Sequence, residues 1–136
     1  RSILVLGDNA GEAVFDRLLI EQLGGGDVFY AVKGAPVIND VTLEDARASG
    51  LGEVAELVEN GSDAPGTILA DCNSGFRGLF HEAGLVMAKG QANYETLSAC
   101  NRRLFFLTQV KCPVIGRDMG REVGDWVIQE HRGTGQ

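Results

Sequence analysis

Several features are scarce in this 136-residue sequence, and each scarcity excludes a class of protein. Its two histidines lie far apart and its three cysteines form no CxxC pair, so neither a metal-binding spacing nor a disulfide framework is indicated. No apolar run approaches the ~20 residues of a membrane span, and no signal-peptide pattern opens the chain. We therefore expect a cytoplasmic protein with reduced thiols that does not associate with membranes.

Positive charge is also scarce. Twelve Lys and Arg stand against nineteen Asp and Glu, which gives a net charge of −7. Binding to a nucleic-acid duplex requires a basic stripe that displaces counterions, and no such stripe is visible in the sequence. We expect no nucleic-acid partner. An acidic protein that handles anionic metabolites would instead need a metal ion or a few well-placed lysines.

Short apolar runs alternate with helical patterns along the chain, and 19 glycines separate many of them. Strands are predicted at 3–6, 27–32, 54–58, 85–88 and 104–110, with a short last one at 126–128. This alternation predicts parallel βαβ units, and right-handed crossovers make a three-layer, doubly wound α/β/α sheet of Rossmann-like type the expected fold. No stretch resembles a linker, so residues 1–136 are expected to form a single α/β domain.

Helices are predicted in the intervening segments. In 11–23, Val14, Leu18 and Leu19 share one helical face, which we expect to pack on the core, and Gly24-Gly25-Gly26 would end the helix. Thr42 is a predicted N-cap with Asp45 as its capping-box partner, for a helix through residue 49. Apolar spacing from residue 67 to residue 80 favours one helix, and residues 91–100 favour a short one.

Polar residues follow the first two predicted strands at the point where each strand ends. Asp8 and Asn9 come directly after the first, and Asp40 lies a few residues beyond the second. In open α/β sheets, ligands bind at the carboxyl ends of the strands. Two carboxylates and an amide oxygen form a hard ligand set for Mg²⁺, Mn²⁺ or a similar ion. The alternative is that Asp8-Asn9 only caps a helix and Asp40 only lies in a turn.

Two lysines leave predicted strands toward the same edge. Lys89 directly follows the run Leu-Val-Met-Ala, and Lys33 directly follows the second strand. A phosphate-binding cation is the functional interpretation of Lys89, and a structural ion pair with Asp8 or Asp40 is the alternative. The turn Gly-Asp-Asn-Ala-Gly-Glu after the first strand matches neither a dinucleotide fingerprint nor a P-loop, so nucleotide binding of those kinds is not supported.

Five spaced segments together resemble the metal-dependent damage-control phosphatases, a family long catalogued as a domain of unknown function (domain 89) with protein-glutamate methyltransferase-like members. The similarity is closest to its compact prokaryotic branch and runs from about Ile3 to Ile128. One departure is Ala92, where the family motif K-G-Q-G-N has glycine. The matching segments are Gly7–Glu12, Lys33–Asp40, Glu59–Thr67, Lys89–Glu95 and Val110–Ile115.

The resemblance implies a Rossmann-like α/β/α domain that holds a divalent ion, such as Mn, Co, Ni or Mg, with the residues matching Asp8, Asn9 and Asp40. It implies that Lys89 binds the substrate phosphate. Family members hydrolyse small phosphometabolites such as sugar phosphates or phosphopantetheine derivatives, and some have been described as carboxyl methyltransferases. A helical region usually precedes the first strand, so we expect this chain to be the catalytic core of a longer protein.

We therefore predict a divalent-metal-dependent phosphomonoester hydrolase for small, damaged phosphometabolites. Asp8, Asn9 and Asp40 would hold the ion, and Lys89, with Lys33 and the loop at Ser62 and Asp63, would bind substrate; Asp40 or Asp63 would position the water. The alternatives are an S-adenosylmethionine-dependent carboxyl methyltransferase, disfavoured by the lack of a G-x-G-x-G loop, and a non-catalytic metal- or phosphate-binding fragment. The sequence leaves the oligomeric state open, a homo-oligomer included.

Overall fold

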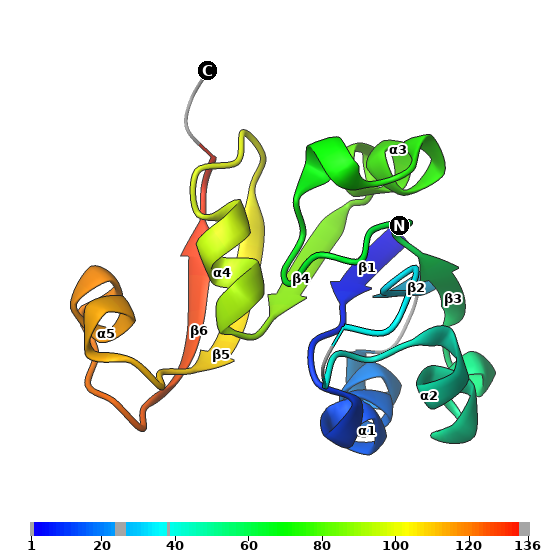
Figure 1. The fold of residues 1–136 in the computed structure, drawn as a ribbon, viewed down its shortest axis with the longest axis horizontal. Coiled ribbons are helices and arrows are strands. Elements are labelled where there is room, and N and C mark those ends of the chain that lie inside the picture. Colours follow the sequence, from blue (N-terminus) through cyan, green and yellow to red (C-terminus); the bar gives the residue numbers. More distant parts are fainter. Residues whose placement is uncertain (1, 24–26, 38, 134–136) are drawn as a thin grey trace.

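A mainly parallel sheet organises the part of the chain that the computed structural model describes, residues 2–23, 27–37 and 39–133 (Figure 1). Its order is β3-β2-β1-β4-β5-β6, and all neighbours pair in parallel except β5 and β6. This confirms the predicted α/β class. The strands are β1 (Ser2–Leu6), β2 (Asp27–Val32), β3 (Glu56–Glu59), β4 (Leu85–Lys89), β5 (Leu104–Gln109) and β6 (Trp126–His131).

The strands predicted at 3–6, 27–32, 85–88 and 104–110 are present within one residue at each end and run parallel. In the centre of the sheet, Leu4 of β1 stands opposite Phe29 of β2 on one side and Val86 of β4 on the other. The predicted short last strand is longer than expected, since β6 continues to His131, and it runs antiparallel to β5. The third strand begins two residues later than predicted, at Glu56.

Helices and short 3-10 turns fill the connections. The capping box expected at Thr42 is present: its hydroxyl accepts from the Asp45 amide, and the Asp45 carboxylate accepts from the Thr42 amide. The prediction of one continuous helix from residue 67 was wrong. A short 3-10 turn is followed by a separate helix that begins at Ser74 and is capped by the Asn73 side chain. The helices are α1 (Ala13–Leu23), α2 (Leu43–Ala48), α3 (Ser74–Glu82), α4 (Gln91–Leu97) and α5 (Pro113–Met119), and the turns are η1 (Ala10–Glu12), η2 (Leu51–Glu53) and η3 (Leu69–Asp71).

The side-chain alternation of β1 divides the interior into two cores, one on each face of the sheet. Leu4 and Leu6 pack with Phe76, Phe80 and other side chains of α3 and α4. Ile3 and Val5 point to the opposite face and pack with residues of α1, α2 and η2, among them Ile20, Ala46 and Leu51. Helices therefore cover both faces, as a doubly wound fold requires.

The inward face of α1 differs from the predicted one. Ala13, Asp16 and Ile20 are buried against the sheet, whereas Val14, Phe15 and Leu18 are more than half exposed. The helix is rotated relative to its apolar pattern because Asp16 has buried partners on the sheet, described below. The predicted stop of this helix at residues 24–26 lies outside the described residues.

An apolar hollow lies beside this outward-facing side of α1. Its volume is about 550 Å³, and it reaches across to Trp126 at the start of β6. Trp126 and Ile128 are both exposed on this side of the sheet. The hollow is lined by Glu12, Phe15, Asp16, Leu19, Lys89, Leu107, Gln109 and Trp126.

Within the described residues, no helix has the length and apolar character needed to cross a bilayer.

The orientation of α1 can be tested with two substitutions on the same helix. Ile20→Ala removes a fully packed side chain and should lower the free energy of unfolding by about 2–5 kcal/mol. Leu18→Ala removes an exposed side chain and should change it by less than about 0.5 kcal/mol. Urea titrations of the two variants provide the comparison. An equal loss in both would contradict the orientation described here.

Candidate active site

Backbone hydrogen bonds draw the end of β1 and the loop after β2 together. The Ala10 amide donates to the Asn39 carbonyl at 2.7 Å, and the Val41 amide donates to the Asp8 carbonyl at 2.8 Å. Between these two bonds, Asn9 and Asp40 pair as an isolated antiparallel bridge. The structure thus places Asp40 beside Asp8 and Asn9 on the carboxyl edge of the sheet, although Asp40 lies more than 30 positions further along the chain.

The carboxyl of Asp8 has a raised pKa in this environment. Burial, together with the neighbouring carboxylates of Glu12 and Asp40, raises the pKa of its carboxyl to about 6, and Lys89 and Lys111 offset only part of this effect. Burial also raises the pKa of Asp40, with a partial offset from Lys33. A site with more negative charge than its surroundings neutralise is suited to a bound cation.

Gly90 allows Asp8 to take this position. Its φ angle is +87°, in the region that side chains rarely adopt, and a Cβ built on it would overlap the Asp8 carboxylate. The carboxylate therefore lies directly against the backbone at the end of β4. Absence of a side chain at residue 90 is a steric requirement of the site.

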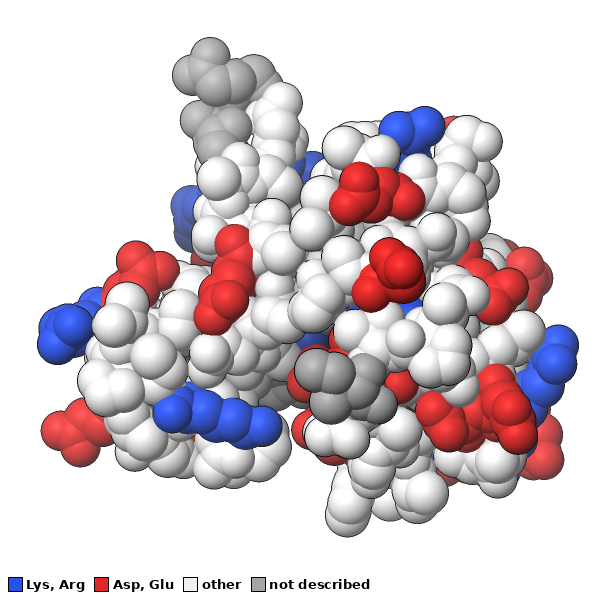
Figure 2. Space-filling view, viewed as in Figure 1, with Lys and Arg blue, Asp and Glu red and all other residues white. Residues whose placement is uncertain are grey.

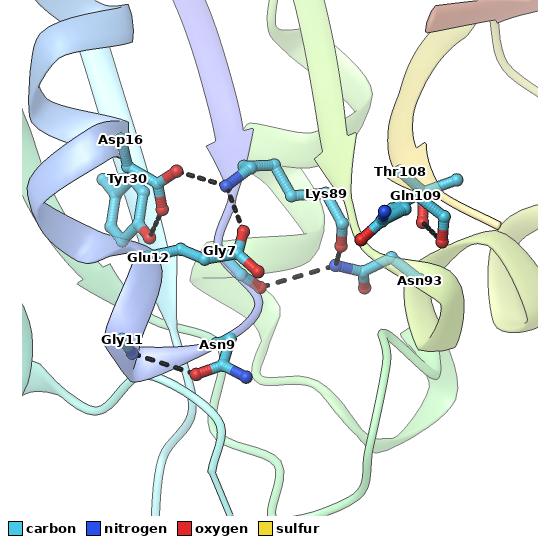
Figure 3. Close-up of polar contacts among 10 residues, drawn as sticks. All are labelled: Gly7, Asn9, Gly11, Glu12, Asp16, Tyr30, Lys89, Asn93, Thr108 and Gln109. Atoms are coloured by element: carbon cyan, nitrogen blue, oxygen red, sulfur yellow. Dashed lines mark hydrogen bonds and ion pairs between the residues drawn. The ribbon is translucent and has the colours of Figure 1, made fainter. Parts of the chain in front are cut away.

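Asn9 has a capping role. Its side-chain oxygen accepts a hydrogen bond of 2.9 Å from the Gly11 amide at the start of η1 (Figure 3). The capping alternative raised from the sequence is therefore present in the structure. An amide oxygen has a second lone pair, so this bond leaves Asn9 able to ligate a cation as well.

Lys89 lies buried in an ion-pair network. Its ammonium donates to the Asp16 carboxylate and, at 2.8 Å, to Glu12, while the Tyr30 hydroxyl donates to the other Asp16 oxygen (Figure 3). Burial lowers the pKa of Lys89, but Asp16 and Glu12 outweigh that effect and hold it above its ordinary value. The ion pair anticipated for Lys89 exists, with partners other than the expected Asp8 or Asp40.

Lys33 is equally buried and has a different environment. Its ammonium donates to the Gly66 carbonyl, and no ion pair with a carboxylate is formed by it among the described residues. Burial lowers the pKa of Lys33, with partial offsets from Asp40, Cys72 and Asp8. Because its hydrogen-bond partner is a neutral carbonyl, the Lys33 ammonium could still form an ion pair with a phosphate.

The loop at Ser62 and Asp63 borders the segment that carries Lys33. The Gly34 amide donates to the Ser62 carbonyl at 3.0 Å. Ser62 is buried, and its hydroxyl accepts from the Ala64 amide at 3.1 Å; Asp63 is exposed. Among the described residues, neither side chain has a hydrogen bond or ion pair to Asp8 or Asp40. The structure brings this loop next to the Lys33 segment through its backbone.

The residues fit a divalent cation through oxygen ligands. In the described ranges, no group of three or more His, Cys, Asp and Glu side chains has the arrangement of a metal site. Asp8, Asp40 and Asn9 instead offer two carboxylates and one amide oxygen, the donor types that Mg²⁺ and Mn²⁺ prefer. A cation bound at this place would lower the raised pKa of Asp8 by stabilising its ionised form.

Two residues important to the site were not singled out from the sequence. Asp16 lies inside a helical pattern, and its only signal was a carboxylate in register with Ala13 and Ile20. Asn93 lies at the start of α4, and its side chain bonds to the ends of both β1 and β4. Asn93 is the last residue of the segment that matches the K-G-Q-G-N motif, but the motif gave it no role, and a buried amide has no periodicity that reveals one.

The Lys89 network generates a stability prediction. Lys89→Met leaves the Asp16 carboxylate buried without its cation, so the free energy of unfolding should fall by about 3–5 kcal/mol. Adding Asp16→Asn removes the uncompensated charge and should restore part of that loss. Urea unfolding of the single and double variants measures both effects. A single variant as stable as the wild type would contradict the buried pair.

Comparison with known proteins places this chain in a family. The Damage-control phosphatase ARMT1-like domain matches residues 1–127. A damage-control phosphatase of Archaeoglobus fulgidus is 40% identical over 131 residues, which are 93% of this chain and 46% of that protein. A damage-control phosphatase of Pyrococcus horikoshii is 38% identical over 135 residues, 96% of this chain and 47% of that protein.

A solved structure agrees with the sequence relationship. The crystal structure of a DUF89 family protein from Pyrococcus horikoshii superposes with a TM-score of 0.91 at 36% identity, covering 96% of this chain and 47% of that one. The chain thus spans about half the length of the relatives it matches. On the family match, these identities and this shared fold, the chain belongs to the damage-control phosphatase ARMT1-like (DUF89) family.

Proposed function

We propose that residues 1–136 form one α/β domain that carries the catalytic centre of a divalent-metal-dependent phosphatase for small phosphorylated metabolites. The observation that carries the proposal is the convergence of Asp8, Asn9 and Asp40 at one sheet edge, with the pKa of Asp8 raised to about 6 by burial and neighbouring acids. Relatives named damage-control phosphatases support the reaction class.

In this proposal Asp8, Asp40 and the Asn9 amide oxygen hold the ion. When bound, a divalent ion polarises the phosphoryl group and lowers the pKa of a coordinated water. The oxygen ligand set favours Mg²⁺ or Mn²⁺ over softer ions, and Co²⁺ and Ni²⁺ remain candidates to be compared. Asp40 or Asp63 would orient the water, and the backbone pairing of Asp40 with Asn9 favours Asp40.

The two lysines take different parts. Lys33, which has a carbonyl as its bonding partner, would contact the substrate phosphate and offset charge that develops during transfer. Lys89 is bound by two carboxylates, so a phosphate would have to compete with Asp16 and Glu12 for it. We therefore assign Lys33 the larger share of phosphate binding, and retain Lys89 as a contact that also holds Glu12 near Asp8. The loop at Ser62 and Asp63 would border the substrate beside Lys33.

Small phosphorylated metabolites, such as sugar phosphates, are the substrates that we propose, with neither nucleic acid nor membrane as a partner. Figure 2 supports the first exclusion for the face it shows, where basic side chains are scattered singly among acidic ones. The three free cysteines, Cys72, Cys100 and Cys112, fit the cytoplasm, which we propose as the location.

The test is turnover of p-nitrophenyl phosphate by the purified chain with Mn²⁺, Mg²⁺, Co²⁺ or Ni²⁺, and after chelation. Metal-dependent release of phosphate is the expected result. Methyl transfer from S-adenosylmethionine without phosphate release would support the methyltransferase alternative. Metal binding without turnover would support a non-catalytic fragment, and the relatives' greater length makes the same assay on the longest available form of the protein the necessary control.

Asp8 should be required for the metal and unfavourable for stability. Its pKa rises from 3.8 to about 6 on folding, so the folded protein holds a proton that the unfolded chain releases, and this carboxyl costs stability as pH rises through that window. Asp8→Asn should raise the melting temperature of the metal-free protein near neutral pH and abolish Mn²⁺ binding by calorimetry. In the wild type, Mn²⁺ affinity should fall as pH drops through about 6, because protons compete.

The Asp8 prediction has a matched control. Asp63→Asn makes the same chemical change at an exposed position near the site and should leave melting temperature and Mn²⁺ affinity unaltered. Undiminished Mn²⁺ binding by Asp8→Asn would remove Asp8 from the ligand set.

Lys33 should affect substrate rather than metal. Lys33→Met keeps the apolar stem and removes the ammonium, so kcat/KM on the phosphomonoester should fall by ~10²-fold or more. Mn²⁺ affinity should hold or rise, because a positive charge near Asp40 has been removed. Steady-state kinetics and calorimetry on one sample separate the two effects. Unchanged kcat/KM in this variant would exclude Lys33 from phosphate binding.

A further inference from the structure

Asn93 joins three separate segments of the site through one side chain. It is 2% exposed and lies in the first turn of α4. Its Nδ2 donates to the Lys89 carbonyl at 2.7 Å and to the Gly7 carbonyl at 3.4 Å (Figure 3), and its Oδ1 accepts from the Thr67 hydroxyl at 2.7 Å. Both amide protons and the amide oxygen therefore have partners.

The two carbonyls that Asn93 binds belong to the peptide groups next to the metal-site backbone. The Gly7 carbonyl is part of the peptide that leads into Asp8, and the Lys89 carbonyl is part of the peptide that leads into Gly90. The Asp8 carboxylate lies directly against Gly90. By holding both peptide planes, the Asn93 amide sets how the Asp8 carboxylate is presented at the sheet edge.

The third bond extends the same control to Lys33. The Thr67 amide and the Gly66 carbonyl are two ends of one peptide group. That group donates to the Thr96 hydroxyl at 2.9 Å and accepts from the Lys33 ammonium. The Thr67 hydroxyl ties this segment to Asn93, so Asn93 also influences where Lys33 is held.

We propose that Asn93 is a positioning residue of the site, which orients Asp8 through the Gly7 and Lys89 carbonyls and steadies the Lys33 segment through Thr67. The inference rests on the proposed function, because it gives Asn93 its role through the metal ligand. It makes no claim that Asn93 touches metal or substrate. Groups that orient metal ligands in this way commonly contribute 10–100-fold to metal affinity.

Loss of a purely structural asparagine should lower stability alone, whereas loss of a positioning asparagine should also weaken Mn²⁺ binding. Asn73 provides the matched control, since its amide also joins two segments: it donates to the Glu59 carbonyl at 3.1 Å and accepts from the Phe76 amide at 2.8 Å. Asn73 caps α3, and its side chain bonds to neither Asp8 nor the segments that Asn93 joins, so Asn73→Ala tests the general cost of losing such an amide.

The experiment measures melting temperature and Mn²⁺ affinity, with the metal alone as the probe, for the wild type, Asn93→Ala and Asn73→Ala. Both variants should melt at lower temperature. Only Asn93→Ala should bind Mn²⁺ at least ~10-fold more weakly, measured by calorimetry well below its melting temperature. Equal Mn²⁺ affinity in the wild type and folded Asn93→Ala would overturn the proposal, as would an equal loss in Asn73→Ala.

A gentler pair of variants keeps the test decisive if Asn93→Ala does not fold. Thr67→Val preserves volume but removes the hydroxyl bond to Asn93, and should weaken Mn²⁺ binding about fivefold, while Thr67→Ser should restore it. Identical affinities in both would overturn the proposal. If the wild type binds no Mn²⁺, the proposed function fails and the positioning role fails with it. If Mn²⁺ affinity falls only in the variants, the proposed function stands.

Discussion

The parallel pairing of β1 with β4 is the constraint on which the rest of the site depends. Because these strands end side by side, the residues after them, Asp8 and Gly90, are forced into contact, and only a glycine leaves room for the carboxylate. The same pairing sets the Gly7 and Lys89 carbonyls near enough for one amide to bind both. A slip of one residue in this register would turn alternate side chains to the other face and separate these groups.

Charge in the interior is arranged as two unequal groups. Lys89 forms ion pairs with both Asp16 and Glu12, so its charge is shared between two carboxylates, and these pairs tie α1 and the turn before it to the end of β4. The group around Asp8 and Asp40 is acidic and unbalanced, and burial raises the pKa of both carboxyls. Under the proposed function, the first set of charges stabilises the fold and the second would bind the cation.

The outward apolar side of α1 follows from the first of these groups. A helix normally turns its apolar stripe to the core. Here the buried position of Asp16, required by Lys89 and Tyr30, turns Phe15 and Leu18 outward beside the hollow that Trp126 borders. Because a buried carboxylate without its cation is costly, this rotation keeps Asp16 paired with Lys89 while these apolar side chains face outward.

The class of fold, the positions of the parallel strands and the edge at which Asp8, Asn9 and Asp40 meet could be predicted from the sequence, because continuous apolar runs, glycine breaks and capping residues are local signals. Only the tertiary structure decided the partners of Lys89, the rotation of α1 and the central place of Asn93. Those features depend on which groups meet across the sheet and lose their water together. These contacts join residues up to 86 positions apart, and such long-range contacts leave no local pattern in the sequence.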